Sequence, residues 1–101
     1  MQYRKLGKTG LEVSAVGLGC AQLGSSSTEY AVQIVQRALE LGVNYLDTAR
    51  GYWDSEVKLG IALKGQRQKA LISTKTTART REEAWRQIHE SLERLQTDYL
   101  D

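Results

Sequence analysis

The chain has 101 residues, which is enough for one small domain with a hydrophobic core but not for two. Its 14 basic and 12 acidic residues leave a formal net charge of +2, and this mild balance predicts neither nucleic-acid nor membrane binding. The single cysteine, Cys20, excludes a disulfide framework within the chain, and the polar first ten residues do not resemble a signal peptide, so we expect a cytoplasmic protein.

The first predicted element is a β-hairpin formed by residues 3–6 and 11–14, with Gly7 and Gly10 in its turn. Glycine supplies the positive φ angles that such turns need. Residues 13–19 follow as a short apolar run that ends in glycine, which is typical of a buried strand.

A helix is predicted after the polar stretch SSST. Ser27 or Thr28 can cap the free N–H groups of its first turn, and Gly42 fits just beyond its end. Its buried face is predicted from apolar residues at helical spacing: Ala31, Ile34, Val35, Ala38 and Leu41.

The same order of elements then repeats. Residues 43–46 predict a second strand. The stretch DSEVKLGIALKG predicts a helix with Asp54 or Ser55 as its cap and Gly65 beyond its end.

A third strand is predicted over residues 70–74, and a third helix begins at Thr80, which has capping-box spacing to Glu83. The side chains expected to be buried on this helix are Ala84, Ile88, Leu92 and Leu95. Residues 98–101 predict the start of a fourth strand. Strands that alternate with crossover helices indicate a parallel sheet with helices packed against it.

Three polar side chains are expected at one edge of this sheet. Asp47 ends the second strand, Lys75 ends the third, and Tyr52 follows Asp47 by five residues. In β/α folds the carboxyl ends of the strands carry the chemistry. An ammonium at about 4 Å favours a phenolate by roughly 4 kcal/mol at an effective dielectric of ~20. Each residue alone is also explained by a turn, packing or solvation role, but the three together favour a proton-donating Tyr52 beside a Lys75 oriented by Asp47.

Several blocks of the chain together resemble the aldo-keto reductase superfamily. They cover nearly the whole chain, in order and with the family's spacing. The blocks are LGxTGLxVSxxGLG (residues 6–19), DTAxxY (47–52), SExxLGxAL (55–63), ISTK (72–75) and SLERLxTDYLD (91–101).

The resemblance implies a (β/α)₈ TIM barrel that binds NADPH and reduces a small aldehyde or ketone substrate. It also implies a catalytic tetrad of Asp, Tyr, Lys and His, whose first three members fall on Asp47, Tyr52 and Lys75. In the family the tyrosine protonates the carbonyl oxygen while the nicotinamide delivers hydride to the carbon. Lys75 would favour the phenolate and Asp47 would hold Lys75.

The resemblance also implies a nicotinamide-binding side formed by Gly19, Cys20 and Ala21, together with Asp47. No metal ligand is implied. One departure from the family is Trp53, which stands where a glycine usually follows the tyrosine and would either narrow the substrate pocket or pack on the loop.

The family's histidine lies a few residues beyond the block that ends at Asp101. His89 is not that residue, because it falls in the middle of the third predicted helix, four residues from both Trp85 and Glu93, and is expected on a helix flank.

A full barrel typically needs about 250 residues. We therefore expect residues 1–101 to be a single partial domain: the N-terminal part of the barrel, with a leading hairpin, three βα units and the start of a fourth strand. The inner face of such a sheet lacks opposing strands, so the isolated chain is expected to self-associate or to be only partly ordered, and to show no carbonyl reduction.

A non-catalytic module, either a self-associating half-barrel or a partner-binding βα unit, remains the alternative because an incomplete sheet leaves open edges. A flavodoxin-like domain ranks last because it needs about five strands. Glycines at 17, 19 and 24 do not have the spacing of a Rossmann turn, and the GKT at residues 7–9 lacks the preceding glycine of a phosphate loop.

Overall fold

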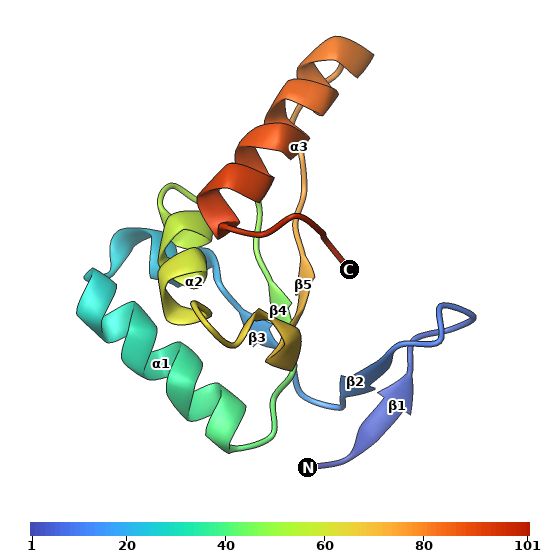
Figure 1. Ribbon diagram of the computed structural model, residues 1–101, viewed down its shortest axis with the longest axis vertical. Coiled ribbons are helices and arrows are strands. Elements are labelled where there is room, and N and C mark those ends of the chain that lie inside the picture. Colours follow the sequence, from blue (N-terminus) through green and yellow to red (C-terminus); the bar gives the residue numbers. More distant parts are fainter.

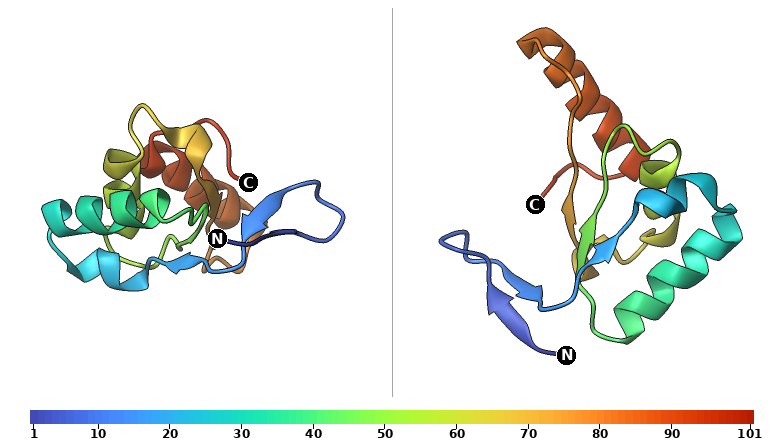
Figure 2. Two further views of the ribbon diagram at one scale, coloured as in Figure 1. Left: turned by 90° about the horizontal axis from the view of Figure 1, so that it is seen from below. Right: turned by 180° about the vertical axis from the view of Figure 1, so that it is seen from behind.

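The computed structural model describes residues 1–101 and begins with the expected hairpin (Figure 1). Strands β1 (Tyr3–Lys5) and β2 (Glu12–Ser14) pair in antiparallel register. Gly7 and Gly10 have φ angles of +54° and +80°, which confirms their predicted role in the turn. The hairpin projects away from the helices in every view (Figures 1 and 2).

A parallel sheet forms the centre of the fold. Its strands are β3 (Leu18–Gly19), β4 (Tyr45–Asp47) and β5 (Leu71–Ser73), in the order β3-β4-β5. Parallel pairing aligns the residues in rows across the sheet. One row consists of Leu18, Leu46 and Ile72, and the next consists of Gly19, Asp47 and Ser73, which end the three strands.

The prediction of one strand over residues 13–19 is wrong. The chain leaves the hairpin at Ser14 and only re-enters a sheet at β3. Side-chain hydrogen bonds turn it: Ser14 Oγ donates to the carbonyl of Val16 at 2.7 Å, and the Ser14 N–H donates to Asn44 Oδ1 at 2.7 Å. Val16 is consequently exposed rather than buried.

Three α-helices connect the strands. Helix α1 (Thr28–Glu40) is capped by Ser27, whose side chain accepts a hydrogen bond from the N–H of Tyr30. Helix α2 (Ser55–Ala62) begins after Asp54, which occupies the N-cap position without a side-chain hydrogen bond. Helix α3 (Arg81–Leu95) is capped by Thr80, which accepts from the N–H of Glu83 at 3.3 Å. Two short 3₁₀ turns, η1 (Ala21–Ser25) and η2 (Arg67–Lys69), complete the elements.

The buried faces of the helices agree with the sequence patterns only in part. On α1, Ala31, Val35 and Ala38 are buried, but Ile34 is only partly buried and Leu41 is exposed. Leu41 lies at the C-cap, where the chain has already turned away from the core. The core comprises Cys20, Leu23, Ala31, Val35, Ala38, Val43, Leu46, Leu59, Ala62, Leu63, Ala70, Ile72 and Leu95.

Helix α3 packs on the molecule mainly through its last turns. Leu95 is buried, whereas Ala84, Ile88 and Leu92 are only partly buried, contrary to the prediction. The reason is visible in Figure 1, where the first half of α3 extends beyond the sheet and the other helices. Gly60 allows the close approach of α2, because a Cβ there would lie 2.5 Å from the carbonyl oxygen of Arg94.

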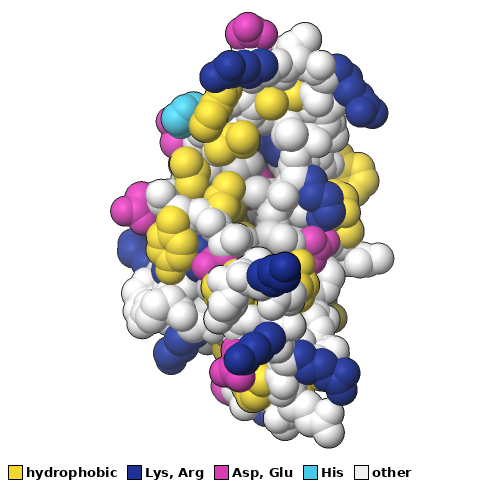
Figure 3. Space-filling view, turned by 90° about the vertical axis from the view of Figure 1, so that its right-hand side faces the viewer, with side chains coloured by type: hydrophobic (Ala, Val, Ile, Leu, Met, Phe, Trp, Pro, Cys, Tyr) yellow, Lys and Arg dark blue, Asp and Glu magenta, His cyan; other side chains and the backbone are white.

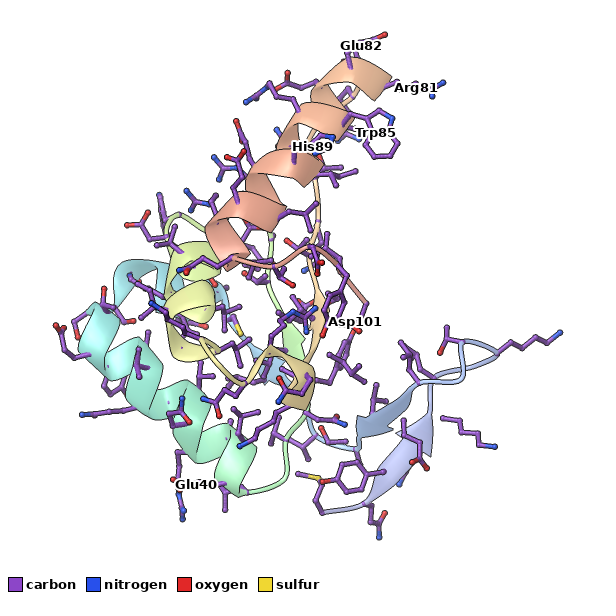
Figure 4. The ribbon with its side chains drawn as sticks, in the orientation of Figure 1. Glu40, Arg81, Glu82, Trp85, His89 and Asp101 are labelled. Carbon is purple, nitrogen blue, oxygen red and sulfur yellow. The ribbon has the colours of Figure 1, made fainter.

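Residues 98–101 do not form the predicted fourth strand. Only Asp101 reaches the free edge of β5, where its N–H donates to the carbonyl of Ile72 and its carboxylate accepts from the N–H of Ile72 (Figure 4). Arg67 holds the segment in place by donating to Tyr99 O at 3.0 Å and to Asp101 Oδ2 at 2.9 Å. A single backbone–backbone hydrogen bond is too few for a strand.

No helix in the structure is both long and apolar enough to cross a membrane.

Candidate active site

The structure brings Asp47 and Lys75 together at the carboxyl ends of β4 and β5. Lys75 Nζ donates to Asp47 Oδ2 at 2.8 Å and to the carbonyl of Thr48 at 2.7 Å. The other carboxylate oxygen of Asp47 accepts a hydrogen bond from Ser73 Oγ. Asp47 therefore uses both oxygens to fix its neighbours, and Lys75 is oriented from two sides.

Tyr52 lies on the same face, in the loop between β4 and α2. Lys75 Nζ is 5.1 Å from the centroid of the Tyr52 ring, within the range of a cation–π contact. The loop is tightened by backbone bonds from the Tyr52 N–H to Ala49 O and from the Ser55 N–H to Tyr52 O. The three residues singled out in the sequence thus form one cluster.

Both charged members of the cluster have shifted pKa values. Burial alone would raise the pKa of Asp47, but hydrogen bonds from Lys75 and Ser73 and the ammonium charge outweigh it and hold that pKa below its usual value. Burial alone would lower the pKa of Lys75, but its hydrogen bond to Asp47 and the charges of Asp47 and Tyr52 raise it. The side chains are 38% and 50% exposed, so the ion pair is accessible to ligands.

A chain of buried hydroxyl groups lies beneath the cluster. Ser55 Oγ donates to the carbonyl of Cys20 at 2.8 Å, so its contact with Thr48 Oγ1 at 2.8 Å is donated by Thr48. The Cys20 N–H in turn donates to Asp47 O. These bonds tie the loops after β3 and β4 to the first turn of α2.

The three residues expected on the nicotinamide side lie in different environments. Gly19 pairs with Asp47, and no atom lies within 4 Å of the position that a Cβ would occupy there. Ala21 is exposed. Cys20 instead points into the core, where burial first and the charge of Asp47 second raise the pKa of its thiol to about 12. Its side chain is therefore neither at the open surface nor reactive as a thiolate.

Trp53 projects from the site into solvent and is 73% exposed. Its φ angle is +44°, a conformation that glycine adopts easily and that a bulky residue rarely adopts. A glycine at this position would adopt the same angle without strain. The Trp53 carbonyl accepts a hydrogen bond from Arg94.

Sequence reasoning missed several residues that build the site. From the sequence, Ser73 is predicted only as part of a strand and Ser55 only as a possible helix cap, and no role is predicted for Thr48. Lys58, which a sequence pattern assigns to the surface, is buried and donates to the carbonyls of Leu23 and Gly24 at 2.8 and 2.9 Å. Strand alternation would have placed Ser73 beside Asp47, but no local signal marks Lys58 as buried.

Two other features lie away from this cluster. His89 is exposed on α3, with its ring 6.0 Å from that of Trp85, in agreement with its predicted place on a helix flank (Figure 4). The largest hollow of the surface, about 780 Å³, is lined by η2, the last turns of α3 and the segment that follows. A smaller hollow of about 250 Å³ adjoins the cluster through Lys75. The largest hollow therefore does not coincide with the Asp47–Lys75–Tyr52 cluster.

Asp47, Lys75 and Tyr52 thus lie together at the carboxyl edge of a parallel β/α sheet, the edge at which β/α folds carry their chemistry. The model of the Aldo/keto reductase family matches residues 15–101, and the chain belongs to that family.

The chain is similar throughout its length to two curated relatives. It is 38% identical to the uncharacterised oxidoreductase YqkF of Bacillus subtilis and 40% identical to the L-galactose dehydrogenase of Arabidopsis thaliana. In both comparisons all of this chain is aligned, but only 37% and 36% of the relative. The chain thus spans little more than one third of the length of these proteins.

The chain also resembles solved structures of aldo-keto reductases, again over little more than one third of their length. The holo form of the aldo-keto reductase AKR11C1 from Bacillus halodurans has a TM-score of 0.90 and 39% identity, covering 100% of this chain and 38% of that protein. A Klebsiella pneumoniae aldo/keto reductase in complex with NADP and acetate has a TM-score of 0.82 and 31% identity, covering 91% of this chain and 35% of that one.

Proposed function

We propose that residues 1–101 supply the acid–base part of the active site of an NADPH-dependent reductase that converts aldehydes or ketones to alcohols. One observation carries this proposal. Lys75 Nζ, held by Asp47 at 2.8 Å, lies 5.1 Å from the ring of Tyr52. A phenol beside an oriented ammonium is a proton donor whose ionised form is stabilised, as general acid catalysis requires.

In this proposal each member of the cluster has a separate role. Tyr52 donates its proton to the carbonyl oxygen of the substrate. Lys75 stabilises the phenolate that remains, and Asp47, with Ser73 on its other oxygen, keeps Lys75 charged and oriented. The buried Thr48–Ser55 contact fixes the loop that carries Tyr52.

NADPH, when bound, would supply the hydride that the carbonyl carbon accepts. The residues present fit the nicotinamide side of this cofactor in part. Gly19 leaves open space in the row that contains Asp47, and Ala21 is exposed next to it. Cys20 would support this surface from below and would not contact the nicotinamide. Its side chain is buried, its N–H donates to the carbonyl of Asp47, and its own carbonyl accepts from Ser55. The NADP complex of the Klebsiella relative supports the choice of cofactor.

Trp53 is proposed as a substrate contact. It follows Tyr52 in the chain and its indole is exposed, so it is available to a substrate that approaches the proton donor. The competing function, a non-catalytic βα module, is less well supported because it gives no reason for the Asp47–Lys75–Tyr52 cluster.

We propose further that the three βα units occupy the first part of a (β/α)₈ barrel, as the superposition on AKR11C1 suggests. The 101-residue polypeptide alone would then lack reductase activity and would self-associate. Figure 3 shows hydrophobic side chains across the face on the right of Figure 1. Large hydrophobic residues exposed over the whole surface are Met1, Tyr3, Leu6, Val16, Tyr30, Leu41, Trp53, Ile61, Trp85 and Tyr99.

The function can be tested in a chimera, here called the completed barrel, in which residues 1–101 replace the matching part of AKR11C1. NADPH binding is measured by fluorescence titration, and NADPH consumption is measured with a panel of aldehydes and ketones. The proposal predicts saturable binding and turnover by the completed barrel, and neither by the 101-residue chain, which should sediment as an oligomer. A folded completed barrel that binds NADPH but reduces no carbonyl would contradict it.

A further inference from the structure

A buried carboxylate lies behind the cluster. Glu56, in the first turn of α2, is 0% exposed. Burial of a carboxylate is strongly unfavourable unless the charge is paired. One of its oxygens, Oε1, accepts a hydrogen bond from Thr74 Oγ1 at 2.7 Å. The other, Oε2, lies 3.3 Å from Arg94 Nε in an ion pair in which neither atom makes a hydrogen bond.

The two partners of Glu56 reach the two loops that carry the proposed proton donor and its lysine. Thr74 directly precedes Lys75. Arg94 donates from Nη2 to the carbonyl of Trp53, which directly follows Tyr52. A continuous path therefore runs from the loop after β5, through Glu56 and Arg94, to the loop after β4. Each end of the path is one residue from a member of the cluster.

Two further observations show that this path restrains the backbone. Trp53 has a φ angle of +44°, which a residue with a large side chain keeps only when its surroundings hold it. The backbone of Arg94 is packed tightly, because α3 approaches α2 so closely that a Cβ on Gly60 would lie 2.5 Å from the Arg94 carbonyl oxygen. From this backbone, the guanidinium links Glu56 of α2 to the carbonyl of Trp53 in the strained loop.

We infer that Glu56 and Arg94 are positioning residues that set the separation of Lys75 and Tyr52. This inference rests on the proposed function for its catalytic consequence, but its structural content can be tested without any activity. The planar fork of Arg94 is what contacts Glu56 and the Trp53 carbonyl at the same time, and a lysine cannot reproduce that fork.

The structural test uses the 101-residue chain labelled with 5-fluorotryptophan and observed by ¹⁹F NMR. The chain contains two tryptophans, and Trp85→Phe assigns their resonances. Arg94→Lys and Glu56→Gln should shift and broaden the Trp53 resonance and leave that of Trp85 unchanged. Trp85 lies on α3 together with Arg94, so it reports any general loosening of that helix.

The matched control is Glu40→Gln. It removes the same charge from a Glu–Arg pair, Arg37–Glu40, which is exposed at the end of α1 that leads into the amino end of β4, on the other side of the sheet from the carboxyl ends of the strands (Figure 4). Neither resonance should move. If Glu56→Gln does not fold, Arg94→Lys and Thr74→Val decide the question. An unchanged Trp53 resonance in a folded Arg94→Lys chain, or equal changes in both resonances, would overturn the inference.

The catalytic test uses the completed barrel. Arg94→Lys should lower kcat roughly ten- to hundredfold, because a misplaced proton donor slows the chemical step, while the KM for the carbonyl and the affinity for NADPH change less than about twofold. A parallel loss of NADPH affinity would indicate a merely structural role and would contradict the inference. An inactive parent chimera would instead refute the proposed function and leave the ¹⁹F result to judge the inference.

Discussion

Two adjacent rows of the parallel sheet have opposite properties, although they are only one residue apart on the same strands. The row of Leu18, Leu46 and Ile72 faces the helices, and Leu46 and Ile72 are almost completely buried. The next row, formed by the residues that end the strands, carries Asp47 with its hydrogen bond from Ser73 and its ion pair with Lys75.

The difference shows how the alternation of side chains along a strand places stabilising residues and charged site residues on different faces of the sheet. Successive strand side chains point to opposite faces, so one face can be packed while the other carries charged groups. The apolar row can then stabilise the fold without contact with the substrate. The polar row can hold a charged pair that adds little to stability.

Among the substitutions that test this difference between the two rows, Tyr52→Phe is expected to have the largest effect. The change removes the proposed proton donor and preserves the ring, so kcat of the completed barrel should fall by about 10²–10⁴-fold while NADPH affinity is largely kept. Steady-state kinetics and fluorescence titration measure the two quantities. Tyr30→Phe, which alters an exposed tyrosine on α1, is the control and should have no effect. Full activity of Tyr52→Phe would refute the assignment.

The apolar row is tested by Leu46→Ala. Leu46 is 0% exposed, so the cavity and the lost burial should reduce the free energy of unfolding by about 2–5 kcal/mol. Leu41→Ala, at an exposed leucine, should cost less than about 0.5 kcal/mol. Urea denaturation of the completed barrel compares the two variants. Equal losses would mean that the buried row does not stabilise the fold as described.

Much of the fold could be predicted because its signals are local. The hairpin glycines, the Ser27 and Thr80 caps and the alternation of strands with helices are all recognisable within short windows. Asp47 and Lys75 could be paired because both follow predicted strands, and parallel strands end at the same edge. The same rule predicts the neighbourhood of a site but not its hydrogen bonds.

The remaining features depend on contacts between distant residues. Glu56 and Arg94 are 38 positions apart in the numbering, so neither shows locally that it is buried against the other. Ser14 turns the chain through its bond with Asn44, which no strand pattern reveals. Helix α3 has the expected apolar spacing, yet its first half extends beyond the sheet, so Ala84 and Ile88 there are only partly buried.

The smallest expected effect concerns the contribution of the polar row to stability. The folded-state pKa of Asp47 is lowered, so its stabilising effect is present above the unfolded pKa of about 3.9 and is lost as the pH falls through the folded value. Asp47→Asn should remove this acid-dependent loss and cost only about 0.2–1 kcal/mol at neutral pH, because the pair is partly exposed. Urea unfolding from pH 2 to pH 7 measures both. A loss as large as that of Leu46→Ala would contradict the comparison of the two rows.

The pH dependence of carbonyl reduction by the Lys75→Met completed barrel tests the central claim most directly. The ammonium of Lys75 stabilises the phenolate in our account, so its removal should move the alkaline limb of the pH–rate profile to higher pH and lower the rate. Lys64→Met, at an exposed lysine, should keep the parent profile. An unchanged profile in Lys75→Met, with only a loss of folding stability, would show that Asp47, Lys75 and Tyr52 form a structural cluster and not an acid–base site.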